Sequence, residues 1–553
     1  MIRRRFSPFR SCRAGSLCTR QLAGALIVGV LTSVFVSAFY INYPEPRVNA
    51  DTPSYLAVAE NIRENGTFTD PFRLPGYPLF ISLMFLVFGN DNLQALSIAQ
   101  GVLFVITAIE IYVITYLITR RVWIASTVAL IASVNTDQLS YAQGVIVEGF
   151  ALWTVVTLAL AIVLFFTRPG ARALWLVAGA LLLALMTRPE WLYVAVPLFA
   201  FIVISARRLD VAWRLMALHA CAAVAVIYGI VGVYMYANGS EKSYGPFVVM
   251  PRVNSLGKIM QYRMQHDAPA EYADVTRRID AFLARKDVAA PYEFIAENPD
   301  LGANYWRLAG DYARTTIRNA PFEYIQKTLE LTHSATLYRR SFGGIDRTGP
   351  FSRELSYIET QSARVHDKYR YFPAIAIVCL IAWLGIVVRG YRAPRAVFMV
   401  AALAFLGLYQ LFVVSAGAYA DWPRLFTPLN PVRVIVIFAS TLVALALLAR
   451  VAESRALELP PRHVRAVLWA WLGGMAALLL ALIASPLTAR LGSVGWSARA
   501  WLEVHPVGAL TLLVLWGWLG LVVLRVIRKA AERPSSRAGR VQDRSLPGGP
   551  GIR

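Results

Sequence analysis

The side chains with the clearest chemical potential lie between residues 50 and 80. Asp51 stands just before a stretch with apolar residues at helical spacing, Tyr55 follows four positions later, and Arg73 and Tyr77 come near its end. A carboxylate can take a proton from a hydroxyl, and an arginine can stabilise negative charge on an oxygen. The same residues also suit a surface helix, because aspartate is a common N-cap and arginine and tyrosine are common beside lipid headgroups. Residue types alone leave both interpretations open.

The sequence lacks the motifs of several other catalytic routes. It contains no G-x-x-x-x-G-K-[ST] phosphate loop, no G-x-G-x-x-G dinucleotide fingerprint, no H-E-x-x-H and no C-x-x-C. Its six histidines are scattered and form no metal-binding cluster, so we expect neither a metal nor a cofactor. An enzyme of this kind draws its energy from a substrate that is already activated.

The composition places this chemistry in a membrane. Of 553 residues, 57% are hydrophobic and 16% are charged, whereas soluble domains carry about 25% charged and about 45–50% apolar residues. Apolar runs recur, most of them near the ~20 residues that a helix needs to cross a bilayer, and three are short. They cover residues 22–40, 93–119, 122–135, 147–167, 173–187, 191–206, 213–236, 371–389, 394–416, 426–449, 465–485 and 506–524. We therefore predict an all-α polytopic membrane protein with about 12 transmembrane helices.

The basic residues predict the orientation. Arginines fall in every second loop, and the first 21 residues carry six arginines and no acid. By the positive-inside rule these loops and both termini are cytoplasmic, which predicts a multi-pass protein of the inner (plasma) membrane. The net charge of +22 follows the same rule. Neither basic tail interleaves aromatic residues with its bases, as a single-strand binder would, so we expect no nucleic-acid partner.

Two segments then lie on the outer face. Residues 41–92 contain a twelve-residue apolar run, Tyr77 to Phe88, which is too short to span and predicts an interfacial or re-entrant helix. Residues 237–370, called the large module below, hold 16 of the 33 acids. Patterns such as the one starting at Glu271 predict amphipathic helices in a mostly helical module. The predicted parts are a basic N-terminus at 1–21, spans one to seven in 22–236, the large module, spans eight to twelve in 371–526, and a basic, disordered tail at 527–553.

The motifs in this order resemble a known family. A first outer loop with Asp-x-x-x-Tyr, then Gly, then Arg-x-Pro-Gly-Tyr-Pro-Leu-Phe is similar to the polyprenyl-phosphate-sugar-dependent glycosyltransferases of the membrane GT-C superfamily. By pattern, protein O-mannosyltransferases and lipid A aminoarabinose transferases are nearest. Further matches are Val-Ile-Val-Glu148, Thr-Arg188-Pro-Glu and Trp-Pro-Arg424-Leu-Phe-Thr-Pro. The resemblance covers about the first seven spans and the position of the large module. Many relatives have Asp-Glu at the first site, whereas Thr52 follows Asp51 here.

The resemblance implies a glycosyltransferase. The donor is a polyprenyl-phosphate-linked sugar, the acceptor is a hydroxyl on a lipid, a glycan or a protein, and membrane lipids surround both. A single carboxylate base without an enzyme nucleophile implies one displacement with inversion at the sugar. The implied roles are catalytic base for Asp51, donor phosphate binding for Arg73, Arg188 and Arg424, a second acidic site for Glu148 and Asp137, and lining of the site for Tyr55 and Tyr77.

Two other functions stay open at this point. A lipid-linked polysaccharide polymerase or ligase also has about twelve spans and a large outer loop, and it would be expected to use a histidine there. His266, His333 and His366 all lie in the large module. A transporter could use the short runs 173–187 and 191–206 as broken helices, although the two halves of the chain show no paired pattern.

Overall fold

The computed structural model describes residues 16–70, 72–209, 211–238, 246–337, 349–391, 393–418 and 422–456. Within these ranges the regular elements are helices, and one isolated β-bridge joins Arg47 to Gly144. The prediction of an all-α chain is confirmed for these residues. In chain order the elements are α1 (Ser16–Asn42), α2 (Thr52–Asn65), α3 (Gly76–Phe88), α4 (Leu93–Thr119), α5 (Val122–Ser133), α6 (Thr136–Gln143), α7 (Val147–Thr167), α8 (Ala171–Thr187), η1 (Pro189–Val194), α9 (Ala195–Ala206), α10 (Trp213–Ala237), α11 (Pro246–Tyr262), η2 (Gln265–Asp267), η3 (Ala270–Tyr272), α12 (Ala273–Lys286), α13 (Pro291–Ala296), η4 (Pro299–Asn304), α14 (Tyr305–Asn319), α15 (Pro321–Leu337), α16 (Ser352–His366), η5 (Asp367–Tyr371), α17 (Phe372–Arg389), α18 (Arg395–Gly417), α19 (Trp422–Phe426), η6 (Thr427–Leu429) and α20 (Asn430–Ala456).

Eight helical stretches among the described residues are long and apolar enough to cross a bilayer. They are Thr19–Asn42, Leu93–Thr119, Val147–Thr167, Pro189–Ala206, Trp213–Ala237, Ser352–Arg389, Arg395–Gly417 and Arg424–Ala444. The chain is therefore a multi-pass membrane protein. The total of twelve spans stays a prediction, because the expected spans 465–485 and 506–524 and the tail 527–553 lie outside the described residues.

Long apolar runs and helices coincide, whereas two of the three short runs form helices shorter than a full span. The runs 93–119 and 147–167 match α4 and α7 residue for residue. The run 122–135 becomes α5, which has only 12 residues, and 173–187 becomes α8, which has 17. After α8 the backbone of Arg188 is extended, with φ −145° and ψ 127°, and the 3₁₀ turn η1 follows. Pro189 causes this break, because a proline disfavours helical geometry at the residue before it.

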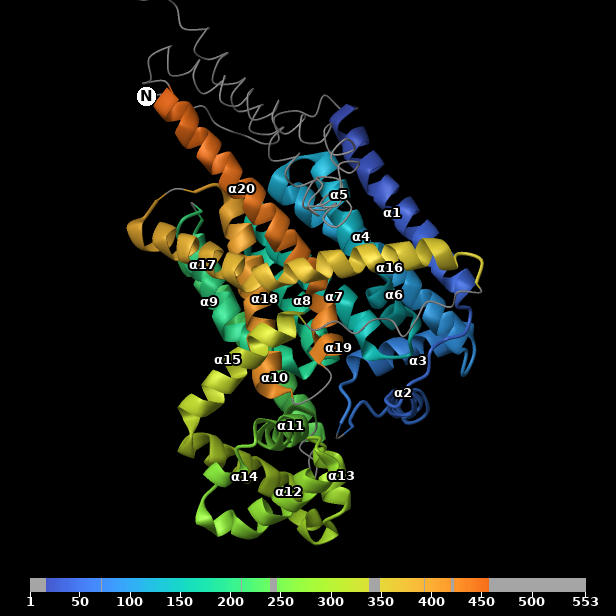
Figure 1. Cartoon of the computed structure of the whole chain (residues 1–553). Coiled ribbons are helices and arrows are strands. Elements are labelled where there is room, and N and C mark those ends of the chain that lie inside the picture. The colour runs from blue at the N-terminus through green and yellow to red at the C-terminus, as the bar shows by residue number, and fades with distance from the viewer. Residues whose placement is uncertain are drawn as a thin grey trace, which may run out of the picture. The chain divides into compact units, whose positions relative to one another are not determined.

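Helix α7 lies at the centre of the membrane domain. Helices α4, α8 and α18 and the turn η6 pack against it (Figure 1). Of its most apolar window, 78% is buried, against 33% for α1. A helix that is apolar on all sides needs other helices around it. Because Glu148 stands in the first turn of α7, this packing carries a carboxylate into the protein interior.

The segment 41–92 forms two short helices beside the spans. Gly66 ends α2 in the left-handed conformation, with φ 61°, which glycine adopts at no steric cost. Helix α3 buries Tyr77, Ile81 and Phe85 and exposes the leucines on its other side. The 13 residues of α3 are too few to cross a bilayer. The interfacial position of α3 stays a prediction.

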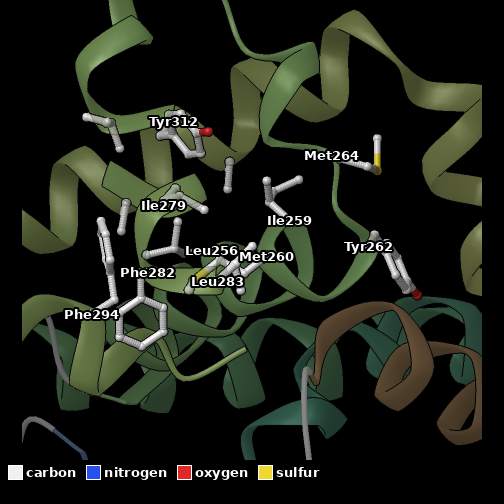
Figure 2. Close-up of a cluster of buried hydrophobic side chains, with 13 residues drawn as sticks. Leu256, Ile259, Met260, Tyr262, Met264, Ile279, Phe282, Leu283, Phe294 and Tyr312 are labelled. Carbon is white, nitrogen blue, oxygen red and sulfur yellow. The ribbon is translucent and has the colours of Figure 1, made fainter. Parts of the chain in front are cut away.

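The large module has a hydrophobic core of its own. Helices α11, α12, α13 and α14 lie together in Figure 1, and Figure 2 shows their core, with Ile259, Phe282, Phe294 and Tyr312 among its buried side chains. In α12 the buried residues are Val275, Ile279, Phe282 and Leu283, which is the spacing of one face of a helix. The described part of the module is helical, as the pattern after Glu271 predicts.

Candidate active site

Asp51 occupies the N-cap position of α2 but does not cap it. Its side chain makes no hydrogen bond to the backbone of α2. Instead, Oδ1 lies 2.7 Å from Nη2 of Arg73, and Oδ2 lies 2.6 Å from Nη1 of Arg424. Thr52, fully buried, fixes the start of the helix by donating a 2.8 Å hydrogen bond to the carbonyl of Val145. The Asp51 carboxylate is thus free of a local structural role and is held by two arginines.

Arg73 is held on several sides. Its Nε donates to Oγ of Ser54 at 2.8 Å, and its Nη1 donates to the hydroxyl of Tyr55 at 3.3 Å. Its guanidinium carbon also lies 4.3 Å from the centre of the Tyr55 ring. The hydroxyl of Tyr234 in α10 donates to the Arg73 carbonyl at 3.2 Å. Ser54 and Tyr55 thus hold the guanidinium beside Asp51, and Tyr234 holds the backbone of Arg73.

Arg424 joins two carboxylates from separate parts of the chain. Its Nη1 pairs with Asp51, and its Nε lies 3.3 Å from Oε1 of Glu148. Glu148 is 1% exposed. Its second oxygen, Oε2, accepts no hydrogen bond from the residues that the structure describes. A buried carboxylate oxygen without such a donor is costly, so this oxygen is suited to receive a group that enters the site.

Arg188 completes the cluster at the break between α8 and η1. Its Nε lies 2.5 Å from Oε1 of Glu190, and its Nη1 donates to the carbonyl of Leu425 at 3.4 Å. Only 5% of Arg188 is exposed. The extended backbone directs this side chain toward α19, where a continued helix would have turned it away. Arg188 also acts electrostatically on Glu148.

Close packing of α3 on α8 places the Arg73 loop near this break. An added Cβ at Gly76 would lie 2.7 Å from the carbonyl oxygen of Met186 and 3.0 Å from Oγ1 of Thr187. Real Cβ atoms do not approach backbone oxygens so closely, so only glycine fits this contact. The glycine of the Pro-Gly-Tyr-Pro motif is therefore needed for the position of the loop that carries Arg73.

The charges of the cluster fix its protonation states. Burial raises the pKa of Asp51, but Arg424 and Arg73 together lower it more, so the pKa lies below the ordinary value. Asp51 is therefore a carboxylate at neutral pH. Burial raises the pKa of Tyr55 to about 12, which keeps its phenol protonated. Burial also raises the pKa of Tyr292, on which Arg73 and Asp51 act. Tyr292 belongs to α13, so the large module reaches the cluster.

The structure brings most of the predicted site residues together. Asp51, Arg73, Glu148 and Arg424 are linked by ion pairs, with Tyr55 under Arg73 and Arg188 beside α19. Tyr77 lies one layer deeper. Its ring packs edge-on against Tyr55 at 5.2 Å and is 1% exposed, so it supports the site from below.

Asp137 is placed elsewhere. It lies in the first turn of α6, near enough to Tyr369 of η5 to act on it electrostatically. The arginines that act on Asp51 and Glu148 are Arg73, Arg188 and Arg424. The described contacts thus make Glu148 the second acid of the cluster and leave Asp137 beside η5.

Sequence reasoning missed three members of the cluster. Ser54 stands within the Asp-x-x-x-Tyr motif, and Glu190 stands within Thr-Arg-Pro-Glu, so their motifs contained a signal. Tyr292 lies more than two hundred residues from Asp51 in the sequence and had none. Its position depends on how the large module packs.

The histidines of the large module do not form a site among the described residues. His266 is exposed, and its Nε2 lies 3.4 Å from Oδ1 of Asp280. His366 is buried at the end of α16, with its ring 4.9 Å from that of Tyr369. His333 belongs to α15. The described residues contain no group of three or more histidine, cysteine, aspartate or glutamate side chains arranged to hold a metal ion.

Comparison with known proteins gives likenesses of structure. No protein-family model matches the chain, and no curated protein is similar to it in sequence. Among solved structures, the chain is similar to the oligosaccharyltransferase AglB from Archaeoglobus fulgidus in complex with an inhibitory peptide and a dolichol-phosphate. The TM-score is 0.40 and the identity 13%, over 78% of this chain and 52% of that one. The chain therefore spans about half the length of that protein.

A second likeness covers more of both chains. It is to ArnT from Cupriavidus metallidurans bound to undecaprenyl phosphate, with a TM-score of 0.35 and 13% identity over 94% of this chain and 79% of that one.

Proposed function

We propose that the chain is an integral-membrane glycosyltransferase that moves a sugar from a polyprenyl-phosphate donor to an acceptor hydroxyl. The observation that carries the proposal is the arginine clamp on Asp51. Two arginines, from the loop before α3 and from α19, hold one carboxylate that caps no helix. A carboxylate that could take up a proton and arginines that could hold a phosphate thus lie within one site.

The chemistry needs both kinds of group. The acceptor hydroxyl is a poor nucleophile until a base takes its proton, and Asp51 is a carboxylate within reach of the site. The acceptor oxygen forms the new bond to the sugar carbon, the bond from that carbon to the phosphate oxygen breaks, and the proton goes to Asp51. Because no enzyme nucleophile intervenes, the configuration at the sugar carbon inverts.

Arginines are suited to the leaving group. The donor is a phosphate diester with one negative charge, and its departure leaves a monoester that carries more charge. Arg73, Arg188 and Arg424 can therefore bind the leaving phosphate more strongly than the donor, which is the condition for lowering the barrier. Each oxygen of Asp51 accepts from one arginine and keeps a second lone pair for the acceptor hydroxyl.

The site belongs on the outer face of the inner membrane, with both termini in the cytoplasm. The distribution of basic residues supports this orientation. The acceptor class stays open between lipid, glycan and protein. Tyr292 of the large module is 42% exposed and offers a surface against which an acceptor could lie.

The decisive experiment is Asp51→Asn in purified protein in nanodiscs. The reaction mixture holds polyprenyl-phosphate sugars and solubilised envelope lipids, glycans and proteins as acceptors, with product formation followed by mass spectrometry. We expect Asp51→Asn to lower transfer by about 10²–10⁴-fold, which is the usual contribution of a general base. An N-cap would tolerate the change, because asparagine and aspartate rank together there.

Asp91→Asn is the matched control. Asp91 is exposed, lies in the same segment and has a φ of 59°, a conformation that asparagine tolerates well. This variant removes one charge at the same side of the membrane and should transfer like wild type. Transfer by Asp51→Asn within a few-fold of Asp91→Asn would leave the mechanism without its base.

A further inference from the structure

One apolar face of α15 is largely exposed among the described residues. Phe322 is 85% exposed, Ile325 48% and Leu329 55%. Residues at positions i, i+3 and i+7 fall within about 60° around a helix axis, so the three side chains form one stripe. We call these residues the α15 stripe.

The other sides of α15 are occupied in different ways. Tyr324 and Leu331 pack against the core of the large module, and Thr328 is 1% exposed. The ring of Tyr324 lies 5.6 Å from that of Tyr262 in α11. A third side is polar, where Glu323 pairs with Lys327 at 2.6 Å. The α15 stripe is thus neither the core-facing side nor the water-facing side of this helix.

Contacts of α15 place it at the membrane boundary. The hydroxyl of Tyr324 donates to the carbonyl of Ala416 at 2.5 Å, one residue before α18 ends. Helix α15 also packs against η5, directly before α17 begins. Helices α17 and α18 are consecutive spans, so the start of one and the end of the other lie at the same side of the bilayer. Figure 1 shows α15 running from α14 to these two helices.

The span and the turn that α15 contacts carry exposed aromatic side chains of their own. Phe412 lies one turn before Ala416 on α18 and is 48% exposed in a membrane span. Tyr371, at the end of η5, is 50% exposed, and tyrosine gathers where spans leave the bilayer. The α15 stripe thus belongs to a helix that contacts the end of one span and the start of the next.

We infer that α15 lies in the outer part of the bilayer and docks the large module onto lipid through Phe322, Ile325 and Leu329. The partner is the membrane itself. A helix with a lipid-facing stripe and a polar edge takes this position by burying its apolar side chains among headgroups and upper acyl chains. This position of the large module on the membrane does not depend on the proposed reaction.

Fluorescent labels on α15 test the inference. Cysteine replaces Ile325 in a background in which the four native cysteines are changed to serine or alanine, and an environment-sensitive label is attached in nanodiscs. The matched control is a cysteine at Glu330, which is exposed on the polar edge of the same helix. Both substitutions are at exposed positions, so neither disturbs the core.

The two labels should report opposite surroundings. At Ile325 we expect blue-shifted emission, quenching by spin-labelled lipid and at least several-fold weaker quenching by iodide than at Glu330. Equal iodide quenching at both positions would overturn the inference, because the stripe would then face water. Protection from both quenchers at Ile325 would also overturn it, since protein would then cover the stripe.

Discussion

Removal of either arginine of the clamp should move the acid limb of the pH–rate profile to higher pH. The structure predicts which removal has the larger effect. Arg424 lies 2.6 Å from Asp51 and Arg73 lies 2.7 Å from it, and both act against a burial that raises the pKa of Asp51. In wild type the pKa lies below the ordinary 3.8. The rate should therefore show no acid limb above about pH 4, since Asp51 is deprotonated throughout that range.

Glutamine at either arginine position removes the charge and keeps a hydrogen-bond donor. A neighbouring opposite charge lowers a carboxyl pKa, so each variant should move the acid limb to higher pH. Arg424 has the larger electrostatic effect on Asp51. The limb should therefore lie highest in the double variant, lower in Arg424→Gln, lower again in Arg73→Gln and lowest in wild type. In the double variant burial alone remains, which places the pKa above its ordinary value.

The measurement is kcat against pH from 4 to 9 at saturating donor, so that weaker donor binding does not enter the profile. Arg63→Gln is the control. Arg63 lies in α2, donates to Oδ1 of Asn90 at 2.7 Å and pairs with Glu64, away from Asp51. Superimposable profiles for the double variant and wild type would refute Asp51 as the titrating base, because burial alone should raise the pKa of Asp51 in the double variant.

Three further predictions concern packing, charge and orientation. Gly76→Ala should lower the free energy of unfolding by about 1–3 kcal/mol, because the added methyl group overpacks against the carbonyl of Met186, and it should lower activity. The control Gly179→Ala, whose added methyl group would meet nothing within 4 Å, should do neither. Thermal unfolding and transfer assays compare the two variants. Burial lowers the pKa of Lys258 to about 7 from 10.5, so the unfolded chain binds the extra proton between these values. Stability should thus rise with pH from 7 to 10.5 by up to about 1.4 kcal/mol per pH unit, and the melting temperature of Lys258→Met should lack that slope. Cysteine at Arg285, whose side chain is 62% exposed, should react with an impermeant thiol reagent in intact cells; reaction only after lysis would reverse the proposed orientation.

Apolar length predicted the long helices because the bilayer sets it. The bounds of α4 and α7 follow directly from the runs 93–119 and 147–167, since a span needs about 20 apolar residues. The short apolar runs did not predict the bounds of their helices in this way. Residues 122–135 and 173–187 are apolar enough for spans, but they form helices of only 12 and 17 residues. Apolar content alone does not say whether lipid or protein covers a short segment.

The site shows a different limit. Asp51 and Arg73 are 22 residues apart, and the motif joins them. Arg424 is 373 residues from Asp51, and nothing local says that the two meet. Arg433, nine residues later, is also an arginine at the start of an apolar run. It is 1% exposed, and its guanidinium lies 5.3–5.9 Å from the rings of Tyr369, Phe372 and Phe426. The sequence around the two arginines is similar, so only tertiary packing determines that Arg424 pairs with Asp51 while Arg433 is surrounded by aromatic rings.

The pair of acids shows the same limit at shorter range. Glu148 and Asp137 are eleven residues apart and both stand in the first turn of a helix, where the helix dipole favours an acid. The first turn of α7 faces the cluster, where Glu148 pairs with Arg424, whereas Asp137 lies on α6, which packs against α4, α7 and α16. The residue types are alike, and the packing of their helices decides which one meets Arg424.

The clamp has a consequence for folding during synthesis. Asp51 and Glu148 leave the ribosome long before Arg424, which joins them. At about 5–20 residues per second, the roughly 280 residues between Glu148 and Arg424 take about 15–55 s to synthesise. During that interval the buried carboxylate of Glu148 is already in the membrane without its ion-pair partner. We therefore expect α7 to reach its final packing late, after α19 has been synthesised. Nascent chains that stop before α19 should not use the donor.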